Sequence, residues 1–117
     1  MNLVDVVKAA LSEDDLLVRA WSLDVRRDPS QLANVPRPTG VTAEQLSVAA
    51  GLVELACTLL GTLPPAWVND VGASPVDLYL PARVRDLPRT RALIFQQTPE
   101  PLKKRHVYAS EDYLSVV

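Results

Sequence analysis

One stretch of the chain carries a narrow polar stripe on an otherwise apolar helix. Residues 42–60 read TAEQLSVAAGLVELACTLL. Their polar or side-chain-free positions recur every three or four residues, at Glu44, Ser47, Gly51, Glu54 and Thr58. A helix this apolar must be enclosed on most of its circumference. Thr42 and Gln45 form a capping box at its start, and Gly61 is placed to end it. We predict a central buried helix whose core residues include Leu52, Leu55 and Leu59.

Two amphipathic helices are predicted before this stretch. The first runs from Leu3 to Leu11, with Asn2 as its cap. Ser12 and Asp15 have capping-box spacing, so the second is expected from about Glu13 to Arg27. The positions expected on its buried face are Leu16, Leu17, Ala20, Trp21 and Leu23. Those expected on its exposed face are Arg19, Ser22 and Arg26. A proline-containing connector, 28–40, follows, with one helical turn around 30–34.

The second half of the chain has a different texture, because seven of the ten prolines follow Gly61. Such a segment favours loops and short helices draped over a helical core. Extended backbone is expected near 76–80, where apolar and polar residues alternate, and at 107–108. A helix is expected at about 89–97, because Pro88 suits a first turn. Its expected anchors are Leu93, Ile94 and Phe95. Thr98 is placed to cap a further turn, and a last short helix is expected from Ser110 to Val117.

Composition indicates an ordinary globular protein. The 117 residues favour one domain, and the net charge of −2 with a pI of about 5.3 argues against nucleic acid as the main partner. Cys57, the only cysteine, lies on the apolar side of the central helix, which is typical of a core residue. We see no secretory signal, and the longest apolar segment is expected to fall short of a membrane span. A cytoplasmic protein without membrane contacts is the simplest interpretation.

Candidate catalytic chemistry is sparse. His106 is the only histidine, so a histidine metal cluster is excluded. No serine lies between glycines in a strand–turn–helix elbow, and the four glycines form no phosphate-binding loop. The adjacent carboxylates at 14–15 and 111–112 are better explained as helix caps than as an acid–base pair. We therefore expect no enzymatic activity, no cofactor and no metal.

Residues 44–60 could also be interpreted as a helix-turn-helix with Gly51 in its turn. The would-be recognition segment, 53–58, contains no Arg, Lys, Asn or Gln that could reach bases or phosphates. This pattern disfavours DNA reading by this stretch.

A dense basic run lies late in the chain, at Lys103, Lys104, Arg105 and His106. It is either a solvated loop or a docking patch for an acidic surface or a phosphate. Trp67 follows two prolines and is either a plug at the edge of the core or an exposed interface anchor. Tyr108, beside the basic run, is a second candidate anchor.

The order of these motifs resembles a group of small bacterial proteins. The late motif is Pro99-Glu100-Pro101-Leu102-Lys103-Lys104-Arg105. It is followed by the apolar pair Val107-Tyr108 and by a terminal helix that begins with a serine, expected here at Ser110 to Leu114. The group also shows Pro-Xaa-Thr-Gly before a long apolar helix, as in Pro36-Arg37-Pro38-Thr39-Gly40. It shows Pro-Xaa-Trp after that helix, as in Pro65-Ala66-Trp67. The resemblance covers roughly 36–114. It implies a partner of a nucleotidyltransferase-like toxin in a toxin–antitoxin-like operon, and it implies no catalytic residues.

Together these patterns predict an all-α, single-domain protein (1–117) with a central buried helix and a proline-rich C-terminal half of short helices and loops. The favoured function is a non-enzymatic protein partner, the antitoxin of a nucleotidyltransferase-like toxin. Its expected partner-binding residues are Lys103, Lys104, Arg105, His106, Trp67 and Tyr108. A DNA-binding transcriptional regulator, a structural or adaptor protein and a small enzyme stay open as alternatives, and so does a homo-oligomer.

Overall fold

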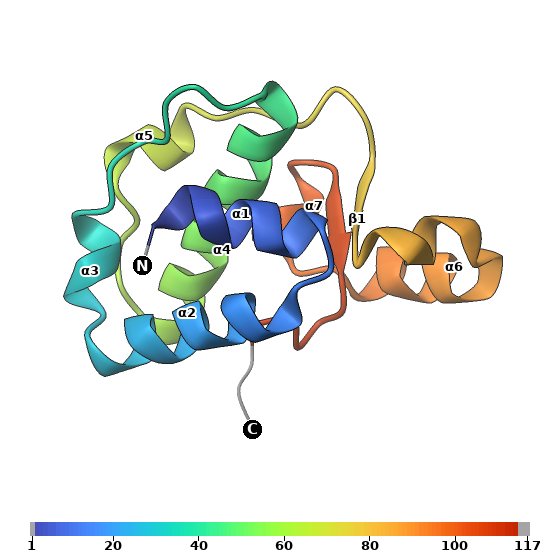
Figure 1. The fold of residues 1–117 in the computed structure, drawn as a ribbon, viewed down its shortest axis with the longest axis horizontal. Helices are drawn as coiled ribbons and strands as arrows, with labels where there is room; N and C mark the ends of the chain where they lie inside the picture. The colour runs from blue at the N-terminus through green and yellow to red at the C-terminus, as the bar shows by residue number, and fades with distance from the viewer. Residues whose placement is uncertain (1, 115–117) are drawn as a thin grey trace.

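The computed structural model describes residues 2–114. This part of the chain forms seven α-helices, one 3₁₀ helix and a two-stranded sheet (Figure 1). The α-helices are α1 (Leu3–Leu11), α2 (Asp15–Arg27), α3 (Ser30–Ala33), α4 (Ala43–Leu60), α5 (Ala66–Asn69), α6 (Pro88–Gln97) and α7 (Glu100–Lys103). The 3₁₀ helix is η1 (Ala82–Asp86), and the strands are β1 (Leu78–Leu80) and β2 (Val107–Ala109). The fold is mostly helical, and the all-α prediction was wrong only in leaving out the small sheet.

Helix α4 is central, as predicted. It contacts α1, α2, α3, α5, α7 and β2. Thr42 and Gln45 form the expected capping box, and Gly61 ends the helix in the left-handed conformation with φ of 70°. Leu52 and Leu55 are buried, and Cys57 is buried beside them. Leu59 is 46% exposed, so its predicted core position was wrong.

The middle of the polar stripe of α4 is covered by the second half of the chain, whereas Thr58 at its end is exposed. The Ser47 hydroxyl is buried and donates to the Gly72 carbonyl at 3.0 Å. Gly51 is buried where α7 packs, and a Cβ at this position would lie 2.7 Å from Cδ2 of Leu102. The missing side chain of Gly51 therefore allows α7 to approach α4 closely.

Helix α1 begins and ends as predicted, whereas α2 begins two residues later than expected. Ser12 does not cap α2; it ends α1, and its hydroxyl donates to the Lys8 carbonyl at 2.7 Å. Glu13 then takes a positive φ of 66°, and Asp14 becomes the cap that accepts from the Leu17 amide. Local hydrogen bonds to the end of α1 thus displaced the capping box predicted from spacing.

The buried face of α2 is rotated from the predicted one. Trp21 is buried as expected, together with Val18, Ser22 and Val25. Leu16 is 77% exposed and Leu23 37% exposed. Ser22 was expected to face solvent, but its buried hydroxyl donates to the Leu114 carbonyl at 2.8 Å, which satisfies both groups.

The two expected extended segments form a parallel pair. Leu78 lies opposite Val107 and Leu80 opposite Ala109. Parallel strands need a long crossover connection, and here it contains η1, α6 and α7. β2 is entirely buried, and it also contacts α4, α6 and α7. The sheet therefore attaches the proline-rich half to the helical core.

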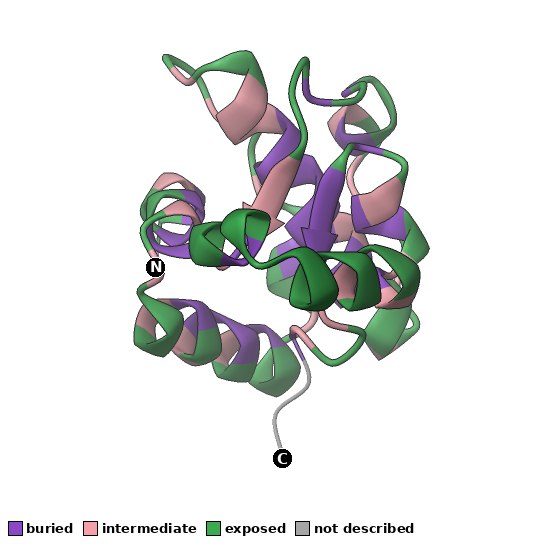
Figure 2. Cartoon of the chain, turned by 90° about the vertical axis from the view of Figure 1, so that its right-hand side faces the viewer, coloured by how far each residue is buried: buried purple, intermediate pink, exposed green. Residues whose placement is uncertain are grey.

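Helix α6 projects away from the rest of the molecule, at the right of Figure 1. Viewed from that side, α6 and the segment before it are exposed along nearly their whole length (Figure 2). None of the ten residues of α6, all of which the structure describes, is buried. Ile94 is half-buried, but Leu93 is 52% and Phe95 43% exposed, so the prediction that all three anchor the helix was wrong.

The end of the described chain differs from the prediction in two places. Thr98 does not cap α7; Pro99 precedes that helix, and the buried Thr98 hydroxyl donates to the Ile94 carbonyl at 2.7 Å. Residues 111–114 form turns where a helix was expected, and the remainder of that predicted helix lies outside the described residues.

By length and composition, α4 is apolar enough to cross a membrane, contrary to the expectation that it falls short. Ten of its eighteen residues are nevertheless buried among the other elements, as in the core helix of a globular protein.

Candidate functional site

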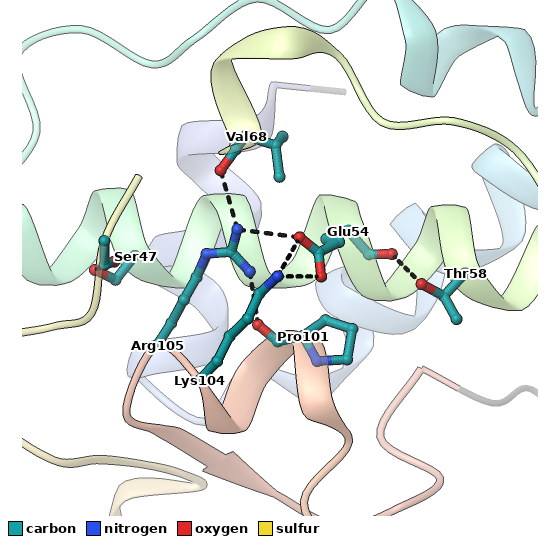
Figure 3. Close-up of polar contacts among 8 residues, drawn as sticks. Ser47, Glu54, Thr58, Val68, Pro101, Lys104 and Arg105 are labelled. Atoms are coloured by element: carbon teal, nitrogen blue, oxygen red, sulfur yellow. Dashed lines mark hydrogen bonds and ion pairs between the residues drawn. The ribbon is translucent and has the colours of Figure 1, made fainter. Parts of the chain in front are cut away.

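The late basic motif is built into the core of the fold. Arg105 is only 2% exposed. Its guanidinium donates to the Pro101 carbonyl at 2.8 Å, to the Val68 carbonyl at 3.0 Å and to Oε1 of Glu54 at 3.1 Å (Figure 3). These contacts join α7, α5 and α4 at one point, and a buried cation is tolerated only with partners of this kind. Arg105 is therefore a structural residue, and its predicted place on an exposed docking patch was wrong.

Lys104 shares the same carboxylate. Its Nζ lies 2.9 Å from the Glu54 carboxylate, while 44% of the Lys104 side chain stays exposed. Partial burial alone would raise the pKa of Glu54, but the hydrogen bonds from Lys104 and Arg105 outweigh it and lower that pKa below its usual value. Glu54 thus stays ionised at neutral pH and holds two of the three cations of the motif.

Lys103 and His106, the ends of the basic run, have different environments. Lys103 is half-buried, and its Nζ lies 4.9 Å from the centre of the Phe95 ring, a cation–π distance. His106 is exposed, has a positive φ of 60° and places Nδ1 3.2 Å from the Ser74 carbonyl. The structure therefore separates the four residues that adjacency in the sequence grouped together.

Trp67 lies at the edge of the core. It is half-buried, packs against the buried cluster, and its indole N–H donates to the Val35 carbonyl at 2.8 Å. This contact ties α5 to the connector before α4. Of the two interpretations of Trp67, the plug at the edge of the core matches these contacts.

Tyr108 is buried inside an aromatic cluster at the base of α6. Its ring centre lies 5.2 Å from that of Tyr79 and 4.9 Å from that of Phe95. Only 5% of Tyr108 is exposed, and burial raises the pKa of its hydroxyl. Tyr108 therefore packs against Phe95 of α6 inside the fold. It is not exposed, so the prediction that Tyr108 is a surface anchor for a partner was wrong.

A second basic cluster, which the sequence analysis did not single out, lies on the projecting part of the molecule. We call residues 82–97 the arm; it contains η1, Leu87 and α6. The arm has four arginines, Arg83, Arg85, Arg89 and Arg91, all exposed, and one acidic residue, Asp86. The four arginines within sixteen positions are a signal that the sequence contains. The basic site was instead predicted at Lys103–Arg105, because those cations are adjacent in the sequence.

The arginines of the arm differ in how far they are engaged. Arg83 pairs with Glu13 at 3.4 Å, and Arg91 donates to the Arg85 carbonyl at 3.0 Å. Within residues 2–114, neither Arg85 nor Arg89 is paired with a carboxylate. The whole chain has a net charge of −2, so the arm is a local positive region on an acidic protein.

Apolar side chains are exposed on the same arm. Leu87 is 47% exposed, and Leu93 and Phe95 are similarly accessible. Leu93 follows Arg89 by four residues, so the two lie on one face of α6. Arginine beside exposed aliphatic and aromatic side chains is typical of protein–protein interfaces.

Other chemistry is limited in the part of the chain that the structure describes. No group of three or more His, Cys, Asp or Glu residues in it could hold a metal ion. A cavity of about 420 Å³ lies between α2 and the base of the arm, and its lining includes Asp15, Arg19 and Asp112. The Ser22 hydroxyl on its wall is already bonded to the Leu114 carbonyl, so this oxygen has a structural task.

The helix-turn-helix interpretation of residues 44–60 was wrong, because α4 is one continuous helix through Gly51.

Comparisons of the chain with protein-family models, curated proteins and solved structures found no match.

Proposed function

We propose that this chain is a non-enzymatic partner protein that binds another protein in the cytoplasm through its arm. The single observation that carries the proposal is that α6 projects with no buried residue while Leu93 and Phe95 are exposed on it. An isolated helix of this length is marginal in water, so a projecting one gains from a second surface to pack against. Exposed apolar side chains gathered on one element mark such a surface.

The resemblance in the late motif supports a more specific form of this proposal. The partner is then a nucleotidyltransferase-like toxin, and this chain is the antitoxin that neutralises it by direct contact. The motif itself has a structural role in this view. Lys104 and Arg105 fix α7 to α4, and Lys103 contacts Phe95, so the motif sets the position from which the arm projects.

The experiment is titration calorimetry of this protein against the product of the adjacent gene. The candidate partner is identified by a Gly-Ser followed by paired aspartates in its amino-acid sequence. We expect a complex in which the toxic activity is suppressed. Leu93→Ser should weaken it about tenfold, because one well-placed apolar residue of an interface contributes about 1–2 kcal/mol. Leu63→Ser, at a leucine that is 85% exposed outside the arm, is the matched control.

Two results would contradict the proposal. One is the absence of any complex between the two folded proteins. The other is a complex that Leu93→Ser and Leu63→Ser weaken equally, because the arm would then not be the binding surface. Circular dichroism of both variants checks that each remains folded.

A further inference from the structure

The distribution of free positive charge indicates what kind of surface the arm fits. Two of the cations of the late motif, Lys104 and Arg105, share the Glu54 carboxylate as their partner within the fold. Arg85 and Arg89 have no such partner among residues 2–114, and both are exposed. Other exposed cations, such as Arg27 and Arg37, lie outside the arm, but only the arm combines four arginines with a single acidic residue.

The neighbours of these arginines favour a protein over a nucleic acid. Phosphate groups are bound by cations and polar groups, and exposed leucines contribute nothing to such binding. On the arm, Leu87 lies between Arg85 and Arg89 in sequence, and Leu93 shares a face with Arg89. An acidic protein surface with an apolar depression between its carboxylates matches both components.

We propose that the arm recognises an acidic protein surface, with Arg85 and Arg89 contacting carboxylates while Leu93 enters an apolar depression between them. This inference rests on the proposed function and names the chemistry of the partner at the same site. The cations that contact the partner are then those of the arm, and not Lys103–Arg105 as the sequence predicted. A guanidinium is well suited to the task because it binds a carboxylate in a bidentate manner.

The rest of the protein makes this selectivity stronger. The chain has fourteen acidic residues, of which only Asp86 belongs to the arm. The arm thus has a net positive charge, with four arginines to one acidic residue, whereas the rest of the chain has a net negative charge, with eight Lys and Arg to thirteen Asp and Glu. Charge arranged in this way orients the encounter and raises the association rate at low salt.

The test uses the full chain and two labelled probes, fluorescein-labelled poly-L-glutamate and a labelled DNA duplex, in fluorescence anisotropy at low salt. The variant is the double substitution Arg85→Glu and Arg89→Glu. Its matched control is Arg27→Glu and Arg37→Glu, two exposed arginines outside the arm, which changes the net charge by the same amount. We expect the parent and the control to bind poly-L-glutamate and the arm variant to bind about tenfold or more weakly.

Several results would overturn the inference. They are the absence of poly-L-glutamate binding, equal weakening by the two double variants, and tighter binding of the DNA duplex than of poly-L-glutamate. The last result would assign the arm to nucleic acid. Circular dichroism establishes that both double variants are folded.

The same variants distinguish this inference from the proposed function. If the adjacent gene's product binds the parent and the arm variant equally, the acidic-surface inference fails while a protein-binding role stands. If that product does not bind at all while poly-L-glutamate binding depends on the arm, the proposed partner is wrong and the preference for an acidic surface stands.

Discussion

Glu54 and Arg105 are 51 residues apart in the sequence, yet the Glu54 carboxylate accepts a hydrogen bond from the Arg105 guanidinium at 3.1 Å. Both side chains are largely withdrawn from solvent, Arg105 at 3% and Glu54 at 15% exposure. The guanidinium also satisfies two backbone carbonyls, those of Val68 and Pro101. One ion pair therefore fixes the second half of the chain to the central helix.

The first prediction concerns the stability that this pair supplies. Arg105→Met should destabilise the fold by about 3–5 kcal/mol, because it leaves buried acceptors and a partly buried carboxylate without their donor. Lys104→Met is the matched control and should cost about 0–1 kcal/mol, since Lys104 reaches the same carboxylate from the surface. The measurement is urea unfolding followed by circular dichroism. Equal losses in the two variants would show that Arg105 is not a structural residue.

The second prediction concerns pH. The pKa of Glu54 in the folded protein lies below its ordinary value of 4.5. A depressed carboxyl pKa contributes stability above the unfolded value and loses it as the pH falls through the folded value. Glu54→Gln should therefore destabilise the protein most near neutral pH, and the difference from the parent should shrink below about pH 4.5.

Urea unfolding of the parent and of Glu54→Gln, each at a series of pH values, measures this difference. Glu100→Gln, at an exposed glutamate, controls for the loss of one negative charge. The free energies of unfolding of the parent and of Glu54→Gln could instead differ by the same amount at every pH. That result would mean that the ion pair does not lower the pKa of Glu54 in the folded protein.

The third prediction concerns Gly51. A Cβ there would meet Cδ2 of Leu102 at 2.7 Å, and Leu102 is fully buried, so it has little room to move. Gly51→Val should destabilise the protein by about 1–3 kcal/mol, as overpacking does. Gly72→Val is the comparison, because a Cβ at Gly72 meets nothing within 4 Å. Thermal unfolding of the two variants decides the point, and a Gly51→Val protein as stable as Gly72→Val would contradict the close approach of α7.

Local signals in the sequence predicted elements better than they predicted faces. The capping box of α4, the glycine at its end, the turn that became α3 and the start of α6 at Pro88 all follow from chemistry within a few residues. The second helix was misplaced because Ser12 could serve either helix, and the end of α1 used it. Spacing alone does not decide between two local uses of one hydroxyl.

Long-range pairing accounts for most of what the sequence did not reveal. The stripe on α4 looked like a solvent-facing edge because its polar groups are ordinary surface residues when viewed singly. Their partners, Gly72 for Ser47 and Arg105 for Glu54, lie in a proline-rich segment whose path is not predictable from periodicity. The same pairing excludes Arg105 from an exposed site, so the candidate basic surface is the arm with its four exposed arginines.

The fourth prediction separates two leucines of α4. Leu55 is 4% exposed, and Leu55→Ala should cost about 2–5 kcal/mol through the lost contacts and the cavity left behind. Leu59 lies four residues later but is 46% exposed, so Leu59→Ala should cost far less. Differential scanning calorimetry of both variants measures the contrast. Similar melting temperatures would show that the face of α4 is assigned wrongly.

The last prediction uses Cys57 as a reporter of opening of the core. The thiol is 1% exposed, and burial raises its pKa, so both access and thiolate fraction are low in the folded protein. An aromatic disulfide reagent should therefore label the native protein slowly and the unfolded protein at once. Because Cys57 is the only cysteine, the signal comes from one site on α4.

Leu55→Ala should raise the labelling rate of Cys57 by more than about tenfold, in proportion to its loss of stability, whereas Leu59→Ala should hardly change that rate. Rapid labelling of the folded parent would mean that α4 opens locally, without unfolding of the core, and that the helix at the centre of the fold is less firmly enclosed than its contacts indicate.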